Sequence, residues 1–159
     1  MDDSQLLSQL LLALAGALMG AFAGGAVYWT AAGRNQRLRT TLDLYAEFHS
    51  PKFNHVRIAA HAAMQGKAMP AAYAAADGEA REAISSVVHF WEKVAQLLHI
   101  RAVNERLLRR FFAQYARWWG ELLCDRREAL ADAEWGATLC DIDWLFQRLK
   151  RERRAGSRR

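Results

Sequence analysis

The sequence predicts an all-α protein with a single N-terminal transmembrane helix followed by an antiparallel four-helix-type bundle. Three observations predict this class. Residues 4–33 contain no charged side chain, and about 20 apolar residues are enough to cross the hydrocarbon core of a bilayer. The apolar residues that follow recur every three or four positions, which is the helical period. No segment alternates between apolar and polar residues as a half-buried strand does.

These patterns divide the 159 residues into five parts. They are a short extracytoplasmic N-terminus (1–5), a transmembrane anchor (6–32), a juxtamembrane extension of the anchor helix (33–49), a cytoplasmic helical bundle (50–150) and a basic disordered tail (151–159).

The anchor ends with an interfacial pair of aromatic residues, Tyr28 and Trp29, and three arginines follow closely. The N-terminal stretch "MDDSQ" carries two aspartates and no basic residue. The positive-inside rule therefore places the N-terminus outside and the C-terminus in the cytoplasm. Residues 21–23, Ala-Phe-Ala, resemble a signal-peptide cleavage site, but the apolar run continues past them. An uncleaved anchor is therefore expected. A bacterial source, and with it an inner-membrane location, is also expected, since 18 arginines against 4 lysines and abundant alanine are typical of GC-rich bacterial genomes.

Small residues form a row along the anchor. Gly16, Gly20 and Gly24 recur every fourth position, which places them on one helix face. Such a face lets a second membrane helix approach closely. The row indicates either self-association or contact with a larger membrane protein, and the alternative is that glycine is simply frequent in this helix.

The stretch "EFHSPKFNHVR", residues 47–57, is predicted to be a corner between two helices. Leu38, Leu42, Tyr45 and Phe48 have helical spacing and indicate that the anchor helix extends to about residue 49. Pro51 cannot continue that helix, because it lacks an amide hydrogen and its ring clashes with the preceding turn. Ser50 is a good N-cap and proline a good first residue, so a new helix is expected to begin there.

Four helices are expected in the bundle. The first ends near Gln65 with Gly66 as its stop, and a loose stretch follows to about residue 78. The others begin near Asp77, near Asn104 and before residue 139, and each presents an apolar stripe that must be buried. The stripes predicted for these three helices are Ile84, Val87, Val88, Trp91, Val94, Ala95 and Leu98; Leu107, Phe111, Tyr115, Trp118 and Leu122; and Trp135, Leu139, Ile142, Phe146 and Leu149.

No residue pattern predicts a reaction or a cofactor. His49, His55 and His61 are six residues apart, so successive ones lie on roughly opposite faces of a helix. The ExxH motif of di-iron bundles does not occur, and neither do a phosphate-binding glycine loop, GxSxG or HExxH. Cys124 and Cys140 lack zinc-site spacing and are expected to be buried free thiols.

Arg57 and Glu92 stand in or next to apolar stripes of their helices. Three interpretations are open: ordinary surface positions with flexible side chains, a structural ion pair across neighbouring helices, and a polar ligand pocket. A pair is physically attractive, because an unpaired buried charge is costly.

The positive charge of the chain is a property of its end. The last ten residues hold six of the 22 Lys and Arg and one of the 17 Asp and Glu, so residues 1–149 carry 16 of each sign. The tail is either solvated or lies on anionic lipid. Because the folded part offers no basic groove, specific nucleic-acid binding is not expected.

The stretches "EFHSPKFNHVR" and "AISSVVHFWEKVAQLL" and the later "WW" region resemble an uncharacterised bacterial family, domain of unknown function 4760, over roughly residues 38–149. The shared elements are "FHSP" with the later Arg57, the aromatic-Glu pair Trp91-Glu92, and Trp118 or Trp119 followed by Arg126 or Arg127. This sequence has Trp91 where the family pattern has Phe or Tyr. The resemblance implies a membrane anchor and a helical cytoplasmic domain and implies no activity.

Together the patterns favour a single-pass membrane protein whose cytoplasmic bundle is a protein-interaction or scaffolding module. One alternative is an accessory subunit held in a larger membrane complex by its glycine face. Another is an enzyme with a polar pocket near Arg57 and Glu92. The expected partners are the lipid bilayer and a protein, or a second copy through the anchor.

Overall fold

The computed structural model describes residues 28–29, 31–124 and 127–150, and all regular secondary structure in these residues is helical. The chain forms two compact units, residues 1–36 and 37–159. In the first unit, residues 28–29 and 31–36 are helical and exposed. None of the helices formed by the described residues is both long and apolar enough to cross a membrane. The predicted anchor lies outside the described residues except at its C-terminal end, and so do the glycine row, the first five residues and the basic tail.

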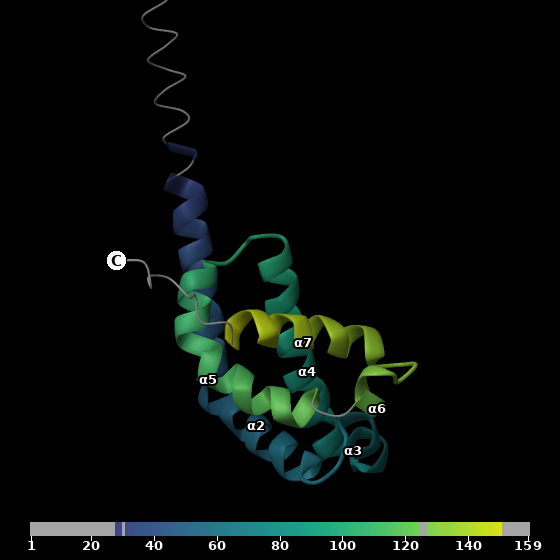
Figure 1. The fold of residues 1–159 in the computed structure, drawn as a ribbon. Helices are drawn as coiled ribbons and strands as arrows, with labels where there is room; N and C mark the ends of the chain where they lie inside the picture. Colours follow the sequence, from purple (N-terminus) through teal and green to yellow (C-terminus); the bar gives the residue numbers. More distant parts are fainter. Residues whose placement is uncertain (1–27, 30, 125–126, 151–159) are drawn as a thin grey trace, which may run out of the picture. The chain divides into compact units, whose positions relative to one another are not determined.

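The second unit begins with the helical segment 37–48 and continues through six helices (Figure 1). They are α2 (Pro51–Met64), α3 (Met69–Ala75), α4 (Gly78–His99), α5 (Glu105–Leu123), α6 (Arg127–Leu130) and α7 (Gly136–Lys150). Helix α4 packs against α2, α3 and α7, while α5 and α6 pack against α7. Helix α4 therefore lies at the centre of this unit.

Side-chain caps define the helix starts that the sequence predicts. Ser50 is the N-cap of α2, and its hydroxyl accepts a hydrogen bond from the Phe53 amide at 3.2 Å. Asp77 caps α4 by accepting from Ala80 at 2.9 Å, and Asn104 caps α5 by accepting from Leu107 at 3.2 Å. Each cap satisfies one of the amides that a helix start leaves without a partner.

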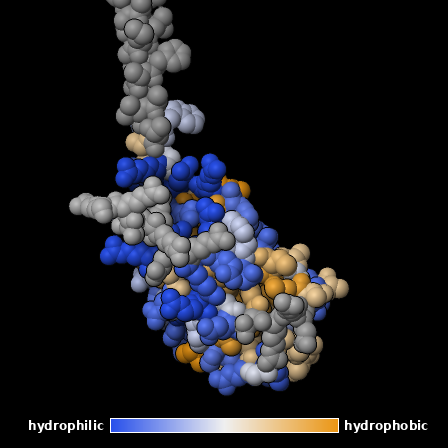
Figure 2. Space-filling view, in the orientation of Figure 1, coloured by the Kyte–Doolittle hydropathy of each residue, from blue (hydrophilic) through white to orange (hydrophobic). Residues whose placement is uncertain are grey.

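The end of α2 also follows the prediction, but the next segment does not. Gly66 has φ +72°, the left-handed conformation that glycine adopts without steric cost just after a helix. Residues 69–75 then form the short helix α3, where a loose stretch was expected. Proline is tolerated in the first helical turn, and the alanines around it are strong helix formers. Met69 and Ala72 are buried, which holds the short helix in place. Figure 2 shows that apolar surface gathers over the end of the unit where α3 and α6 lie.

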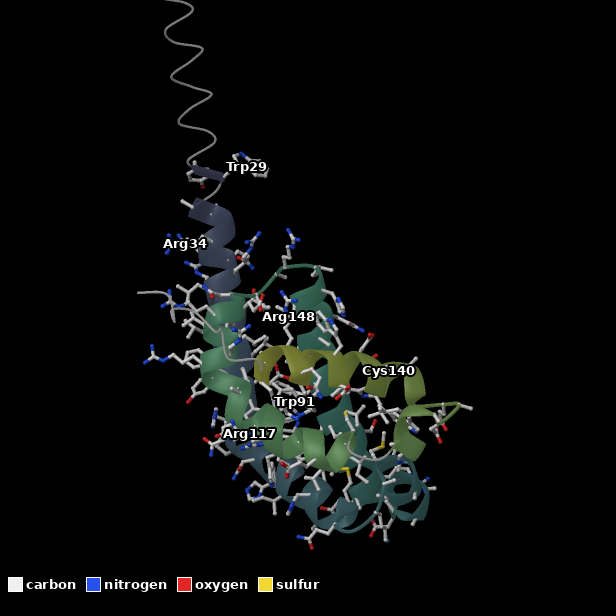
Figure 3. All side chains as sticks on the ribbon, viewed as in Figure 1. Trp29, Arg34, Trp91, Arg117, Cys140 and Arg148 are labelled. Atoms are coloured by element: carbon white, nitrogen blue, oxygen red, sulfur yellow. The ribbon has the colours of Figure 1, made fainter. Side chains whose placement is uncertain are left out.

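The core is built around the indole of Trp91 on α4 (Figure 3), which is fully buried. Its ring centroid lies 5.6 Å from that of Phe48, 5.8 Å from Phe112 on α5 and 4.9 Å from Phe146 on α7. All three contacts are edge-to-face, the geometry that aromatic rings prefer because of their quadrupoles. Three segments of the chain thus meet on one side chain of α4.

The predicted stripe of α4 is the buried one, since all seven of its residues are buried. In α7, the four predicted residues from Leu139 to Leu149 are buried, and Trp135 is half-buried just before the helix begins. The sequence therefore predicts both the helices and their inward faces here.

The predicted stripe of α5 is wrong by one residue. The buried row is Leu108, Phe112, Ala116, Trp119 and Leu123. The predicted row is half-buried, except for Trp118, which is 41% exposed. In segment 37–48, the predicted helix is present, and of the residues that indicated it Phe48 is buried while Leu38, Leu42 and Tyr45 are exposed. Helix α5 carries two adjacent apolar rows, and spacing alone does not decide which row faces the core.

The register of α5 can be tested with two identical substitutions one residue apart. Leu108 is fully buried and Leu107 is half-buried. Leu108→Ala should lower the free energy of unfolding by about 2–5 kcal/mol, the usual cost of a cavity in a core. Leu107→Ala should cost clearly less. Denaturant unfolding of the full chain in detergent measures both, and a larger loss for Leu107→Ala would contradict the observed register.

Candidate functional site

Two surfaces flank α2, and both are built from the stretches that the sequence singles out. The first, here called the α2–α5 seam, consists of His49, Arg57 and His61 opposite Tyr115 and Trp118 of α5. The second, here called the α2–α4 pocket, lies between residues 47–56 and α4.

Arg57 is the central residue of the seam. Its guanidinium carbon lies 4.1 Å from the centre of the Phe48 ring and 5.8 Å from that of Tyr115, so its charge rests on aromatic faces. One Nη atom donates to Oδ1 of Asn54 at 2.8 Å. The Nε atom is buried and has no acceptor among the described residues. Burial lowers the pKa of Arg57, and the interaction with Tyr115 partly opposes this.

A second pair of side chains extends the seam along the same two helices. The His61 ring lies 4.7 Å from the indole of Trp118. Trp118 is 41% exposed, and the neighbouring Ile58 of α2 is 61% exposed. Two large apolar side chains, Trp118 of α5 and Ile58 of α2, are therefore exposed on the helices that form the seam.

His49 stands at the end of segment 37–48 and contacts three aromatic rings, those of Tyr45 at 4.4 Å, Phe48 at 5.4 Å and Tyr115 at 5.5 Å. Partial burial of the His49 ring lowers its pKa, and the nearby positive charge of Arg57 lowers it further. Both effects disfavour the protonated ring. His49 therefore contributes a neutral aromatic ring to the seam near neutral pH.

The structure gives Arg57 and Glu92 different partners, in place of the ion pair considered from sequence. Oε1 of Glu92 accepts a hydrogen bond from the hydroxyl of Thr138 on α7 at 3.4 Å. Arg57 instead lies against segment 37–48 and α5. The two residues therefore do not form one polar site.

The α2–α4 pocket is an open depression with a volume of about 460 Å³. Its lining comes from both stretches that carry the family resemblance: Glu47, Ser50, Lys52, Phe53, Val56, Ser86, His89, Phe90 and Lys93. At its edge, Nζ of Lys93 lies 2.6 Å from both carboxylate oxygens of Glu47. Sequence reasoning missed the pocket, although the cluster of polar residues next to Phe53 and Phe90 is the signal that could have indicated it.

The cysteines and histidines do not come together. Cys124 is buried, its thiol is 3.8 Å from the Leu139 carbonyl oxygen, and burial raises its pKa to about 12. Cys140 is exposed on α7 (Figure 3), so the expectation that both thiols are buried is wrong for this residue. Among the described residues, no group of three His, Cys, Asp or Glu side chains could hold a metal ion. Of the predicted arginines after the tryptophan pair, Arg126 lies outside the described residues and Arg127 begins α6.

Comparison with known proteins identifies the family. Residues 8–121 match the family described as Domain of unknown function (DUF4760). The chain belongs to this family. The match covers every residue of the seam and the pocket, and it ends within α5. No curated protein and no solved structure matched the chain.

The lowered pKa of His49 predicts a pH dependence of stability. The unfolded chain binds a proton at His49 near pH 6.5, whereas the folded chain does so only at lower pH. Stability is therefore lost as the pH falls below about 6.5 and through the folded pKa. His49→Gln should lose less stability on acidification from about pH 8 to pH 5 than the unmodified chain.

Thermal melts of the full chain in detergent measure this effect. His55→Gln is the matched control, because His55 is also exposed on the surface near the start of α2, and it should behave like the unmodified chain. If His49→Gln retains the whole acid-dependent loss, His49 does not cause it.

Proposed function

We propose that this chain is a membrane-anchored protein-interaction module whose partner presents a carboxylate to Arg57 in the α2–α5 seam. One observation carries the proposal. Arg57 is a half-buried cation that rests on aromatic rings and has no ion-pair partner among the described residues.

Desolvating a cation without a counter-charge costs free energy. The Phe48 ring offsets part of that cost, since a cation over an aromatic face gains roughly 0.5–2 kcal/mol. A partner carboxylate would offset more, because guanidinium and carboxylate form short charge-assisted hydrogen bonds. Arginine, tryptophan and tyrosine are also the residues that dominate binding energy at protein interfaces. The seam presents all three types next to the exposed Ile58.

The proposal places this module at a bacterial inner membrane. Residues 6–32 would form the single span, with the N-terminus outside and the helical unit in the cytoplasm as an antiparallel four-helix-type bundle. The charge asymmetry around the apolar segment supports this orientation. The family match supports the apolar segment as part of the family domain, because it begins at residue 8.

An accessory subunit of a larger membrane complex is the second candidate. The spacing of Gly16, Gly20 and Gly24 favours it, since a row of small residues allows close helix contact in the membrane. An enzyme centred on Arg57 and Glu92 receives no support from the geometry, because these side chains contact different helices.

The orientation is tested by reporter fusions after Arg159. A reporter that is active only in the cytoplasm should be active there, because the arginines after the apolar segment favour the inner side. A reporter that requires export should be inactive at the same position. The opposite pair of results would reverse the proposed topology.

The interface is tested by two isoleucine substitutions on the full chain in native membranes. Ile58, which follows Arg57 on α2, is 61% exposed, and Ile100 is 73% exposed just after α4. With a tagged chain extracted in mild detergent, Ile58→Ser should reduce recovery of a stoichiometric protein partner roughly fivefold, equivalent to ~1 kcal/mol of binding. Ile100→Ser should leave recovery unchanged, and equal recovery with both variants would exclude the seam.

Two further variants separate the candidates. Arg57→Glu should abolish the contact by charge repulsion if the partner presents a carboxylate. Gly20→Leu should leave that partner bound. If Gly20→Leu releases the partner while Arg57→Glu retains it, the accessory-subunit alternative replaces the seam proposal.

A further inference from the structure

We propose that the α2–α4 pocket binds a small amphipathic anion, a molecule that carries a carboxylate or phosphate group on a short aromatic or apolar body. This site is separate from the seam, because the pocket lining does not include Arg57, Tyr115 or Trp118.

The size of the pocket suits such a ligand. Its volume of about 460 Å³ lies within the range of small-molecule sites, which hold roughly 300–1,000 Å³. Residues 47–56 form one wall and residues 86–93 of α4 form the other. The packing of α2 on α4 therefore creates the depression, and the caps at Ser50 and Asp77 fix where these two helices begin.

The apolar part of the pocket comes from Phe53, Val56 and Phe90. The two phenylalanine rings lie 5.0 Å apart at an interplanar angle of 44°. Phe90 belongs to the core, and Phe53 and Val56 pack against the core. These side chains form a firm apolar surface on which an aromatic ring or a short alkyl chain can rest.

The polar part is positively charged. Lys52 and Lys93 contribute two cations against the single carboxylate of Glu47. Lys52 has no ion-pair partner in the part of the chain that the structure describes. The first turn of α2, which begins beside the pocket, contains no acidic residue to balance the positive end of its dipole. Ser86 and His89 add hydrogen-bonding groups. This arrangement favours an anion over a cation or a neutral molecule.

The Lys93–Glu47 pair can yield to a ligand. The two side chains are 44% and 43% exposed, and exposed ion pairs contribute little to stability. A ligand anion and the Glu47 carboxylate would therefore compete for the same ammonium group. Removing the carboxylate should strengthen ligand binding, whereas removing the ammonium should weaken it.

The opposite effects expected for the two substitutions provide the decisive test. Isothermal titration calorimetry on the full chain in non-ionic detergent would compare phenylacetate, phenyl phosphate and the neutral phenylacetamide. We expect the anions to bind at least about tenfold more tightly than the amide, and the two anions together identify which acid group is preferred. Lys93→Gln should weaken anion binding about tenfold, and Glu47→Gln should strengthen it about threefold. Lys67→Gln, an exposed lysine outside the pocket, should change nothing.

Several results would overturn the proposal. One is that phenylacetamide binds as tightly as the anions. Another is that neither anion binds at up to about 10 mM. A third is that Lys67→Gln weakens anion binding as much as Lys93→Gln does. A fourth is that Lys93→Gln and Glu47→Gln change the affinity for the anions in the same direction. Both variants break the ion pair, so a merely structural role of that pair would change the affinity of both variants alike. Circular dichroism melts confirm that each variant is folded, as expected for exposed side chains.

Discussion

The arrangement of the helical unit depends on the position of the Phe48 ring. This ring is fully buried, and its centroid lies within 6 Å of the rings of Phe53, Phe90, Trp91, Phe112 and Tyr115. These neighbours come from α2, α4 and α5. On another side the ring supports the guanidinium of Arg57. Phe48 therefore joins the core to the seam, and the Ser50-Pro51 corner directly after it sets the start of α2 against the same ring.

The sequence predicted the starts of α2, α4 and α5 well, because a helix start depends on residues that are close together in the sequence. An N-cap requires one side-chain oxygen and an amide three residues later, and Ser50, Asp77 and Asn104 each provide this within one turn. Helix faces were predicted well only where the apolar row is single. The predicted row of α4 is wholly buried, whereas α5 carries rows one residue apart, Leu107 with Phe111 and Leu108 with Phe112. Which of two such rows is buried depends on neighbouring helices, and that information is not local.

The candidate site was predictable in its residues but not in its pairings. The segments around Arg57 and Trp91-Glu92 stood out in the sequence, and they do flank the two surfaces. The ion pair, one of the three interpretations that the sequence left open, does not form, because Arg57 lies against Phe48 and Tyr115, whereas Glu92 lies against Thr138 of α7. An aromatic face can offset part of the cost of desolvating an arginine, even where no carboxylate is present. Lysine would be a poorer replacement here, since its ammonium lacks the planar group that stacks on rings.

The limits of the family match are not the limits of the folded unit. The match ends at residue 121, within α5. Beyond it, Leu139, Ile142 and Phe146 of α7 are fully buried, and Phe146 packs edge-to-face on Trp91. Without α7 these contacts would be lost and the Trp91 side of α4 would be exposed to water, at a cost of roughly 25 cal/mol per Å² of apolar surface. The seam and the pocket thus belong to the matched range, but the core that holds them in place requires the chain to continue to the end of α7.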